Sequence, residues 1–231
     1  MTTTKQPQFS VKAEGDAFTL YRDDEALRTP RNLQVTAPTR RLAEALAQEC
    51  GGQGEKMDLR KMPLTQMTLT AIDISAMHRE EVITGIMRFG ESELICQRAT
   101  DPADLVEEQN KIWQPYLDWC KTKFNADLRT GSGIIPFKQA PEALAALRAF
   151  VEKLDAFSLT GLSEAVGISG SLVLGLALAT GYADVASIVA AAELDNLWQS
   201  KKWGEDPAVQ NRQNEITQEL EICARFFALL S

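Results

Sequence analysis

Residues 161–206 read GLSEAVGISGSLVLGLALATGYADVASIVAAAELDNLWQSKKWGED, and this stretch decides the fold. It contains the longest apolar run of the chain, from Ile168 to Ala179. Such a run is too short to span a bilayer, which takes about 20 apolar residues. We therefore predict a helix that is buried on nearly all sides, in which Gly170, Gly175 and the alanines allow neighbouring helices to approach closely.

Charged and aromatic residues follow this apolar run. Gly181 is placed to end the buried helix, and Asp184 can cap the following helix by accepting a backbone N–H. Asp195 lies at the flank of the apolar face of that helix, where a carboxylate needs water, a hydrogen-bond donor or a partner. Trp198 and Trp203 stand on either side of a lysine pair, after which the chain breaks and starts a last helix.

The first part of the chain predicts a small antiparallel sheet. Short β-prone segments separated by turn signals predict strands at residues 9–13, 18–21, 27–29 and 33–35. Thr39 is expected to cap the first helix, and residues 93–98 read as one further strand. Other helices are expected to start near residues 62–65, 78, 101–102, 141, 158 and 206–207.

A glycine pair marks the predicted domain boundary. Gly131–Ser132–Gly133 is the strongest boundary signal, and the composition becomes helical after it. We therefore predict an α+β fold with a loose tail over residues 1–8. An α+β domain with a small antiparallel sheet is expected over 9–130, and an all-helical domain over 131–231.

Composition limits the class of protein. The chain has 231 residues, 45% of them hydrophobic, and a net charge of −8, which argues against nucleic-acid binding because that needs a basic face. Its four cysteines are far apart, so buried or incidental thiols in a reducing compartment are favoured over a disulfide framework or a metal site. The opening residues MTTTKQPQFS show neither a secretory signal nor an organelle presequence.

Candidate catalytic residues are scarce. His78 is the only histidine, and no nucleophile elbow is present to pair with it, so a surface position is expected. The glycine cluster at 51–54 ends a helix and lacks a following GK[ST], which excludes a phosphate loop. One histidine and scattered cysteines offer no metal-ligand cluster. Nothing in the sequence supports an enzyme.

Five ordered segments of the chain resemble the ATP synthase assembly factor twelve family. They are Leu27–Pro30 with Val35, Pro38–Thr39 and Leu42–Ala45; Met62–Thr65 with Thr70–Asp73; Arg88–Phe89 with Ser92–Ala99; Gln109 with Trp113, Pro115 and Leu117–Trp119; and Gly170–Leu174 with Leu194–Asp195, Trp198–Gln199 and Trp203–Asp206. These segments cover nearly the whole chain and follow the order found in the family. No single motif is specific for the family, but the ordered set is. Cys50 departs from the pattern, because the family usually has tryptophan there, and we expect the local core to be repacked.

The resemblance implies a fold and a function. It implies an α+β N-terminal domain followed by an orthogonal helical bundle, with no cofactor and no catalysis. Members of this family chaperone the alpha subunit of the F-type ATP synthase catalytic head. The resemblance therefore implies a protein that binds the free alpha subunit and shields its inter-subunit surface until the beta subunit replaces it. We expect a monomer that neither binds nucleic acid nor enters a membrane. Without a presequence, an alphaproteobacterial cytoplasmic member is expected.

The resemblance also directs attention to possible contact residues. The candidates for the partner-binding surface are Asp195, Glu205, Asp206, Trp198, Trp203, Arg28 and Arg31. The family depends on a C-terminal acidic position, which either Asp195 or Glu205 could supply. A structural role remains open for Asp195, as a helix cap or an arginine partner, for both tryptophans, as core residues, and for the two arginines. A helical adaptor for a different protein is the alternative function.

Overall fold

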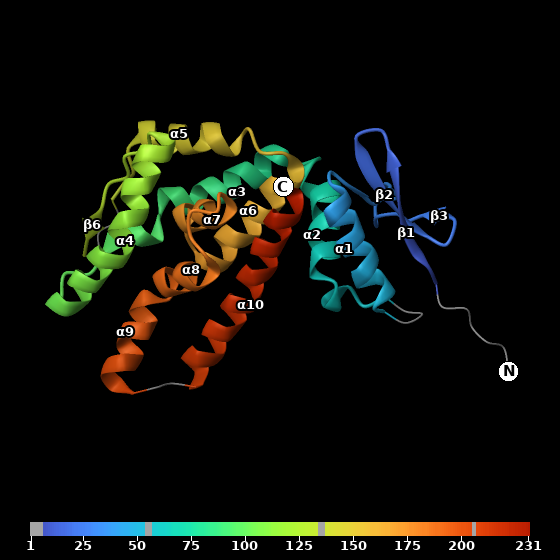
Figure 1. The fold of residues 1–231 in the computed structure, drawn as a ribbon. Coiled ribbons are helices and arrows are strands. Elements are labelled where there is room, and N and C mark those ends of the chain that lie inside the picture. Colours follow the sequence, from blue (N-terminus) through green and yellow to red (C-terminus); the bar gives the residue numbers. More distant parts are fainter. Residues whose placement is uncertain (1–6, 54–56, 134–136, 205–206) are drawn as a thin grey trace. The chain divides into compact units, whose positions relative to one another are not determined.

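The computed structural model describes residues 7–53, 57–133, 137–204 and 207–231, which divide into two compact units (Figure 1). The first unit takes the described residues up to Arg79, together with Asp155–Gly161 and Arg225–Ser231. The second unit takes those of Glu80–Leu154 and Leu162–Ala224. Each unit therefore combines segments that are far apart in the sequence.

A four-stranded antiparallel sheet opens the first unit. Strands β1 (Phe9–Glu14) and β2 (Ala17–Arg22) form a hairpin whose turn uses Gly15 at a φ of 61°. Strands β3 (Glu25–Ala26) and β4 (Thr36–Ala37) both pair with β2. The prediction of an α+β fold that begins with a small antiparallel sheet is confirmed.

Helices complete the first unit. They are α1 (Arg40–Gly51), the 3₁₀ helix η1 (Leu59–Lys61), α2 (Pro63–Thr70) and the π-helix η2 (Ala71–Ser75). Thr39 caps α1 as expected, because its hydroxyl oxygen accepts from the Leu42 N–H at 3.1 Å. The Glu49 carboxylate accepts from the Leu64 and Thr65 N–H groups at 3.1 and 2.9 Å. Glu49 thus supplies the acceptors for the start of α2, where Met62 gives no side-chain cap.

The second unit is mainly helical. Its elements are α3 (Arg79–Glu91), the 3₁₀ helix η3 (Leu94–Cys96), β5 (Gln97–Arg98), α4 (Ala103–Phe124), β6 (Gly131–Ser132), α5 (Pro141–Val151), α6 (Ala156–Ser169), α7 (Leu172–Ala179), α8 (Val185–Ala192), α9 (Leu194–Trp203) and α10 (Pro207–Leu230). Arg79 at the start of α3, the first residues of α6 and the last residues of α10 belong to the first unit. Pro115 does not divide α4, which continues through it.

Helix α7 forms the core of the second unit, and its N-terminus is held by a buried carboxylate. Every residue from Leu172 to Leu178 is buried. The Ser171 hydroxyl oxygen accepts from the Leu174 N–H at 3.0 Å, and Glu93 Oε2 accepts from the Val173 N–H at 3.1 Å. The Ser171 hydroxyl also donates to Glu93. Burial raises the pKa of Glu93 to about 7, although these hydrogen bonds oppose the shift.

Three local predictions are corrected by the structure. Residues 93–98 form a 3₁₀ turn, with only Gln97–Arg98 as a strand, because Glu93 turns inward to cap α7. The apolar run from 168 to 179 is split between α6 and α7 by Gly170 at a φ of 68°. Helix α6 begins at Ala156, ahead of the start expected near residue 158, because Asp155 caps it: its Oδ1 accepts from two N–H groups of the first turn.

The compact units divide at a different position from the predicted boundary. Gly131–Ser132 is not a linker but strand β6, which pairs in parallel with β5. Gly90 of α3 packs so closely on α7 that a Cβ would lie 2.8 Å from Leu172 Cδ2. The segment from Glu80 to residue 130 therefore packs with the helices, and the division falls at Arg79–Glu80.

Replacing Gly175 tests the close approach of α6 and α7. A Cβ at Gly175 would lie 2.5 Å from Val166 Cγ2 and 3.2 Å from the Val166 backbone nitrogen. We expect Gly175→Ala to lower the free energy of unfolding by about 1–3 kcal/mol through overpacking. Gly167→Ala on α6 is the control. No described atom outside the adjoining backbone of α6 lies within 4 Å of a Cβ built there, so a gain of up to about 1 kcal/mol is expected. Urea unfolding followed by tryptophan fluorescence measures both, since all four tryptophans belong to the second unit.

Glu93→Gln tests the buried carboxylate. Folding raises the Glu93 pKa from 4.5 to about 7, so the folded state keeps a proton that the unfolded chain releases. The stabilisation is complete below pH 4.5 and is lost as pH rises through 7. We expect the free energy of unfolding of the natural protein to fall by roughly 3 kcal/mol relative to the glutamine variant over this range. Urea unfolding at several pH values measures the difference, and a pH-independent difference would contradict the prediction.

Candidate functional site

Helix α9 gathers three of the residues predicted as partner contacts, and it packs against α4. Asp195 lies in the first turn of α9 with an exposed side chain. Its Oδ1 accepts from the side-chain Nε2 of Gln109, on α4, at 2.8 Å. Within the described residues, Asp195 is therefore an exposed carboxylate that accepts a hydrogen bond from a buried amide, with no helix N-terminus or arginine as its partner.

The two tryptophans of α9 have opposite environments. Trp198 is 7% exposed and packs in the core, whereas Trp203 is 76% exposed. Their rings meet edge to face, with centroids 5.8 Å apart and planes at 89°. Trp198 is therefore a core residue, whereas Trp203 is an exposed aromatic side chain.

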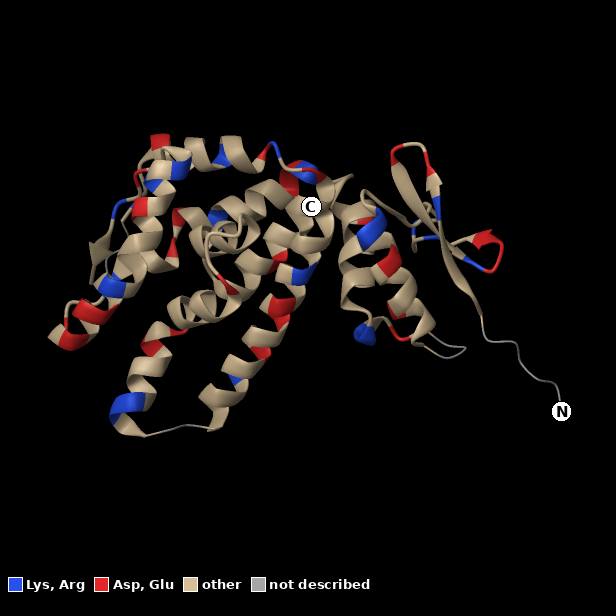
Figure 2. Ribbon diagram, in the orientation of Figure 1, with Lys and Arg blue, Asp and Glu red and all other residues tan. Residues whose placement is uncertain are grey.

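The C-terminal end of α9 is basic (Figure 2), and both of its lysines are paired with carboxylates of α4. Lys201 Nζ lies 3.3 Å from Glu108 Oε1, and Lys202 Nζ lies 2.6 Å from Asp104 Oδ2. Lys202 Nζ also lies 5.2 Å from the centre of the Trp198 ring. These pairs attach α9 to α4. Two further predicted contacts, Glu205 and Asp206, lie outside the described residues.

Gln109 is the site residue that sequence reasoning missed. It appeared among the family-like positions but was not predicted to act. It is 1% exposed and lies on the buried face of α4 with Leu105, Trp113 and Tyr116. A polar residue in an apolar line at helical spacing is the signal that could have identified it, because a buried amide requires hydrogen-bond partners.

The two predicted arginines lie in the first unit. Arg28 Nη1 donates to the Asn32 carbonyl at 2.8 Å across a turn. The Arg31 N–H donates to Asp73 Oδ2 at 3.3 Å, and its Nη1 lies 3.3 Å from Met77 Sδ. Both arginines are exposed. They share one turn, and the turn is fastened to the π-helix η2 and the residues after it.

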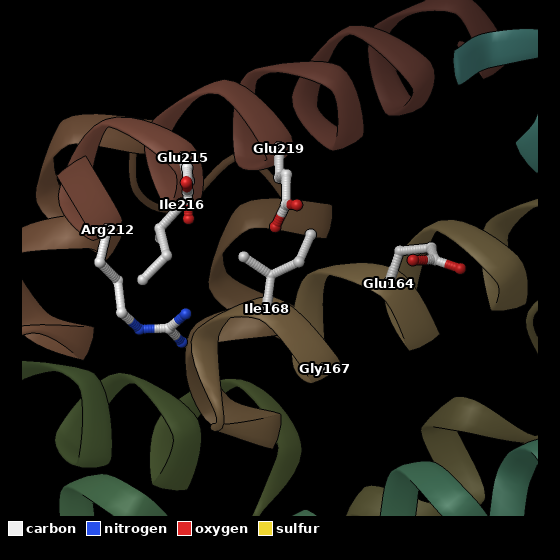
Figure 3. A pocket seen from close by; sticks show the side chains of 7 residues that line it. All are labelled: Glu164, Gly167, Ile168, Arg212, Glu215, Ile216 and Glu219. Carbon is white, nitrogen blue, oxygen red and sulfur yellow. The ribbon is translucent and has the colours of Figure 1, made fainter. Parts of the chain in front are cut away.

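A polar hollow of about 230 Å³ lies between α6 and α10 in the second unit (Figure 3). It is lined by Glu164, Gly167, Ile168, Arg212, Glu215, Ile216 and Glu219. In Figure 3, Arg212 lies at one end, Glu164 at the other, and Glu219 between them. Burial, and to a smaller extent the charge of Glu219, raise the pKa of Glu164. Sequence reasoning did not identify this hollow, because its residues are separated by about a fifth of the chain.

The histidine and the cysteines form no catalytic or metal-binding cluster among the described residues. His78 is exposed, as expected, and all four cysteines are free and buried, as predicted. Burial raises the pKa values of Cys96, Cys120 and Cys223 to about 12, so these thiols stay protonated. In the part of the chain that the structure describes, no three His, Cys, Asp or Glu side chains are grouped for a metal ion. Among the helices of the described ranges, none is both long and apolar enough to cross a membrane.

Comparisons with known proteins agree in one family. A sequence model of the ATP12 chaperone protein family matches residues 5–121. Atp12 from Paracoccus denitrificans is 33% identical, with a TM-score of 0.92 over 97% of this chain and 96% of that chain. An Asp-to-Lys mutant of the same Paracoccus protein gives a TM-score of 0.92 at 32% identity, with the same coverage. The mitochondrial protein atp12 of Schizosaccharomyces pombe is 26% identical over 152 residues, and this chain spans about half the length, 52%, of that curated relative.

The two tryptophans of α9 should respond differently to truncation. We expect Trp198→Ala to lower the free energy of unfolding by about 3–5 kcal/mol, because it empties a buried site. Trp203→Ala should change it by less than about 1 kcal/mol, because most of that ring is in water. Urea unfolding followed by far-ultraviolet circular dichroism measures both. Equal losses would show that Trp203 packs as a core residue.

Proposed function

The chain belongs to the ATP12 chaperone family, and we propose that it assists assembly of the catalytic head of the F-type ATP synthase by binding the free alpha subunit. The observation that carries the proposal is the similarity to Paracoccus Atp12 over 97% of the chain at 33% identity. The chaperone shields the inter-subunit surface of the alpha subunit and is later replaced by the beta subunit. This role needs no cofactor and no catalytic step, and we propose that the chain acts as a monomer in the bacterial cytoplasm.

A physical argument supports reversible shielding. A subunit awaiting assembly exposes apolar surface that promotes aggregation. A chaperone must cover this surface and still release it, so a few strong contacts within a modest interface suit the task better than a large apolar one. Helix α9 offers such contacts, with the exposed Trp203 at its last residue as an aromatic anchor and Asp195 in its first turn as a charged contact.

The other predicted contact residues have a secondary role in this proposal. Arg28 and Arg31 present two exposed cations on one turn of the first unit, where they could meet a second part of the client. Glu205 and Asp206 follow directly after α9 in the sequence, so they stay candidates for the acidic contact. The hollow between α6 and α10 has no assigned part in client binding.

Capture of the alpha subunit tests the proposal. Tagged protein is used to pull down partners from native lysate, followed by mass spectrometry. We expect the alpha subunit without the beta subunit. Recovery of a different protein would favour the helical adaptor, and recovery of the alpha subunit only in complex with beta would contradict shielding of the free subunit.

Charge reversal of Asp195 tests the proposed contact. We expect Asp195→Lys to abolish capture of the alpha subunit while the circular-dichroism melt stays close to that of the natural protein, because the side chain is exposed and reversed charge mainly disrupts recognition. Glu221→Lys is the matched control, since Glu221 is exposed on α10, and it should capture normally. Loss of the folded melt in Asp195→Lys would instead assign Asp195 a structural role.

A further inference from the structure

The side chain of Gln109 connects three elements of the second unit. Its Oε1 accepts from the Ala99 N–H, just after β5, at 2.8 Å, and its Nε2 donates to Asp195 Oδ1 on α9 at 2.8 Å. These partners fix the orientation of the amide, because a backbone N–H can only donate and an ionised carboxylate can only accept. Gln109 is 1% exposed, so its amide lies beneath the surface and reaches the exposed Asp195 from below.

The backbone that carries Gln109 is also held. Arg98 Nη1 donates to the Gln109 carbonyl at 2.7 Å, and the Arg98 guanidinium lies 5.1 Å from the centre of the Trp113 ring. One turn further along α4, the Trp113 indole N–H donates to the Ala191 carbonyl at 2.8 Å. The two donors, Gln109 and Trp113, are four residues apart on α4, and their acceptors, Asp195 and Ala191, are four residues apart on the α8–α9 segment. This matched spacing fixes the register of α4 against Asp195.

Asp195 differs from the other charges on its helix. Lys201 and Lys202 are paired with carboxylates of α4, whereas no ion pair to Asp195 occurs within the described ranges. Among the described residues, its exposed carboxylate accepts a single hydrogen bond, through Oδ1, from an uncharged donor. No cation of the described ranges therefore neutralises its negative charge, which is available to a cationic partner.

We propose that Gln109 is a positioning residue for client binding, which orients the Asp195 carboxylate towards a positively charged side chain of the client. The inference rests on the proposed function for the identity of the client. An exposed aspartate without an anchor samples several rotamers and must be ordered when it binds. Gln109 orders it beforehand, which removes part of that entropic cost.

Two measurements on the full chain test this role. Nitrogen–carbon and carbon–carbon scalar couplings to Asp195 Cγ report its χ1 rotamer without any client present. We expect one rotamer in the natural protein and averaged couplings in Gln109→Leu. Averaging in the natural protein, or unchanged couplings in the variant, would overturn the positioning role, and neither result depends on client binding.

A double-mutant cycle tests whether positioning serves binding. The dissociation constant for purified alpha subunit is measured for the natural protein, Gln109→Leu, Asp195→Ala and the double variant. We expect Gln109→Leu to weaken binding roughly threefold to tenfold, and the double variant to bind no more weakly than Asp195→Ala. Additive losses would mean that Gln109 acts through general structure and would overturn the proposal.

The chain offers a matched control for the cycle. Gln114, also on α4, donates from Nε2 to Asp118 Oδ1 at 2.8 Å, in an exposed pair. Gln114→Leu should leave both the couplings and the dissociation constant unchanged. If the natural protein does not bind the alpha subunit, the proposed function fails, while the couplings still decide whether Gln109 positions Asp195.

Discussion

The second unit depends on the carboxylate of Glu93, which is buried against the N-terminus of α7. A helix whose first turn is fully buried cannot use water to satisfy the N–H groups of that turn. Glu93 and Ser171 supply the acceptors instead. Because Glu93 belongs to the segment that links α3 to β5, this interaction binds that segment to the helical core. The cost is a carboxyl group whose pKa is raised to about 7 by burial.

The dependence of local structure on distant partners, as for Glu93 and α7, also explains how much of the fold could be predicted from the sequence. The caps at Thr39 and Asp184 and the glycine end at Gly181 are local, and each was predicted correctly. Residues 93–98 are predicted as a strand because Leu94 and Cys96 alternate with Ile95. The 3₁₀ turn found there depends on the hydrogen bonds between Glu93 and the distant Ser171–Val173 segment. The pairing of Gly131–Ser132 with β5 is equally non-local. A flexible tripeptide and a short parallel strand have the same local signature.

In the candidate site too, the sequence identifies the residues but not their burial or their hydrogen-bond partners. The sequence placed Asp195, Trp198 and Trp203 in one segment, and the structure places them on one helix. The sequence could not show that one tryptophan is buried and the other exposed, since that depends on the packing of α9 against α4. Nor could it show that Asp195 has an amide partner 86 residues away in the chain. Gln109 was visible as a polar residue in an apolar line, but its partners were not.

The composition of the first unit has a consequence for vectorial synthesis. Its sheet and first helices are made early, yet it also includes Arg225–Ser231, which leave the ribosome after the whole second unit. Phe226 is fully buried, and the Leu229 carbonyl accepts from the Thr39 hydroxyl at the start of α1. During translation the sheet and α1 therefore stay incompletely packed until these late residues have been synthesised. The first unit is therefore the first to be synthesised and the last to be completed.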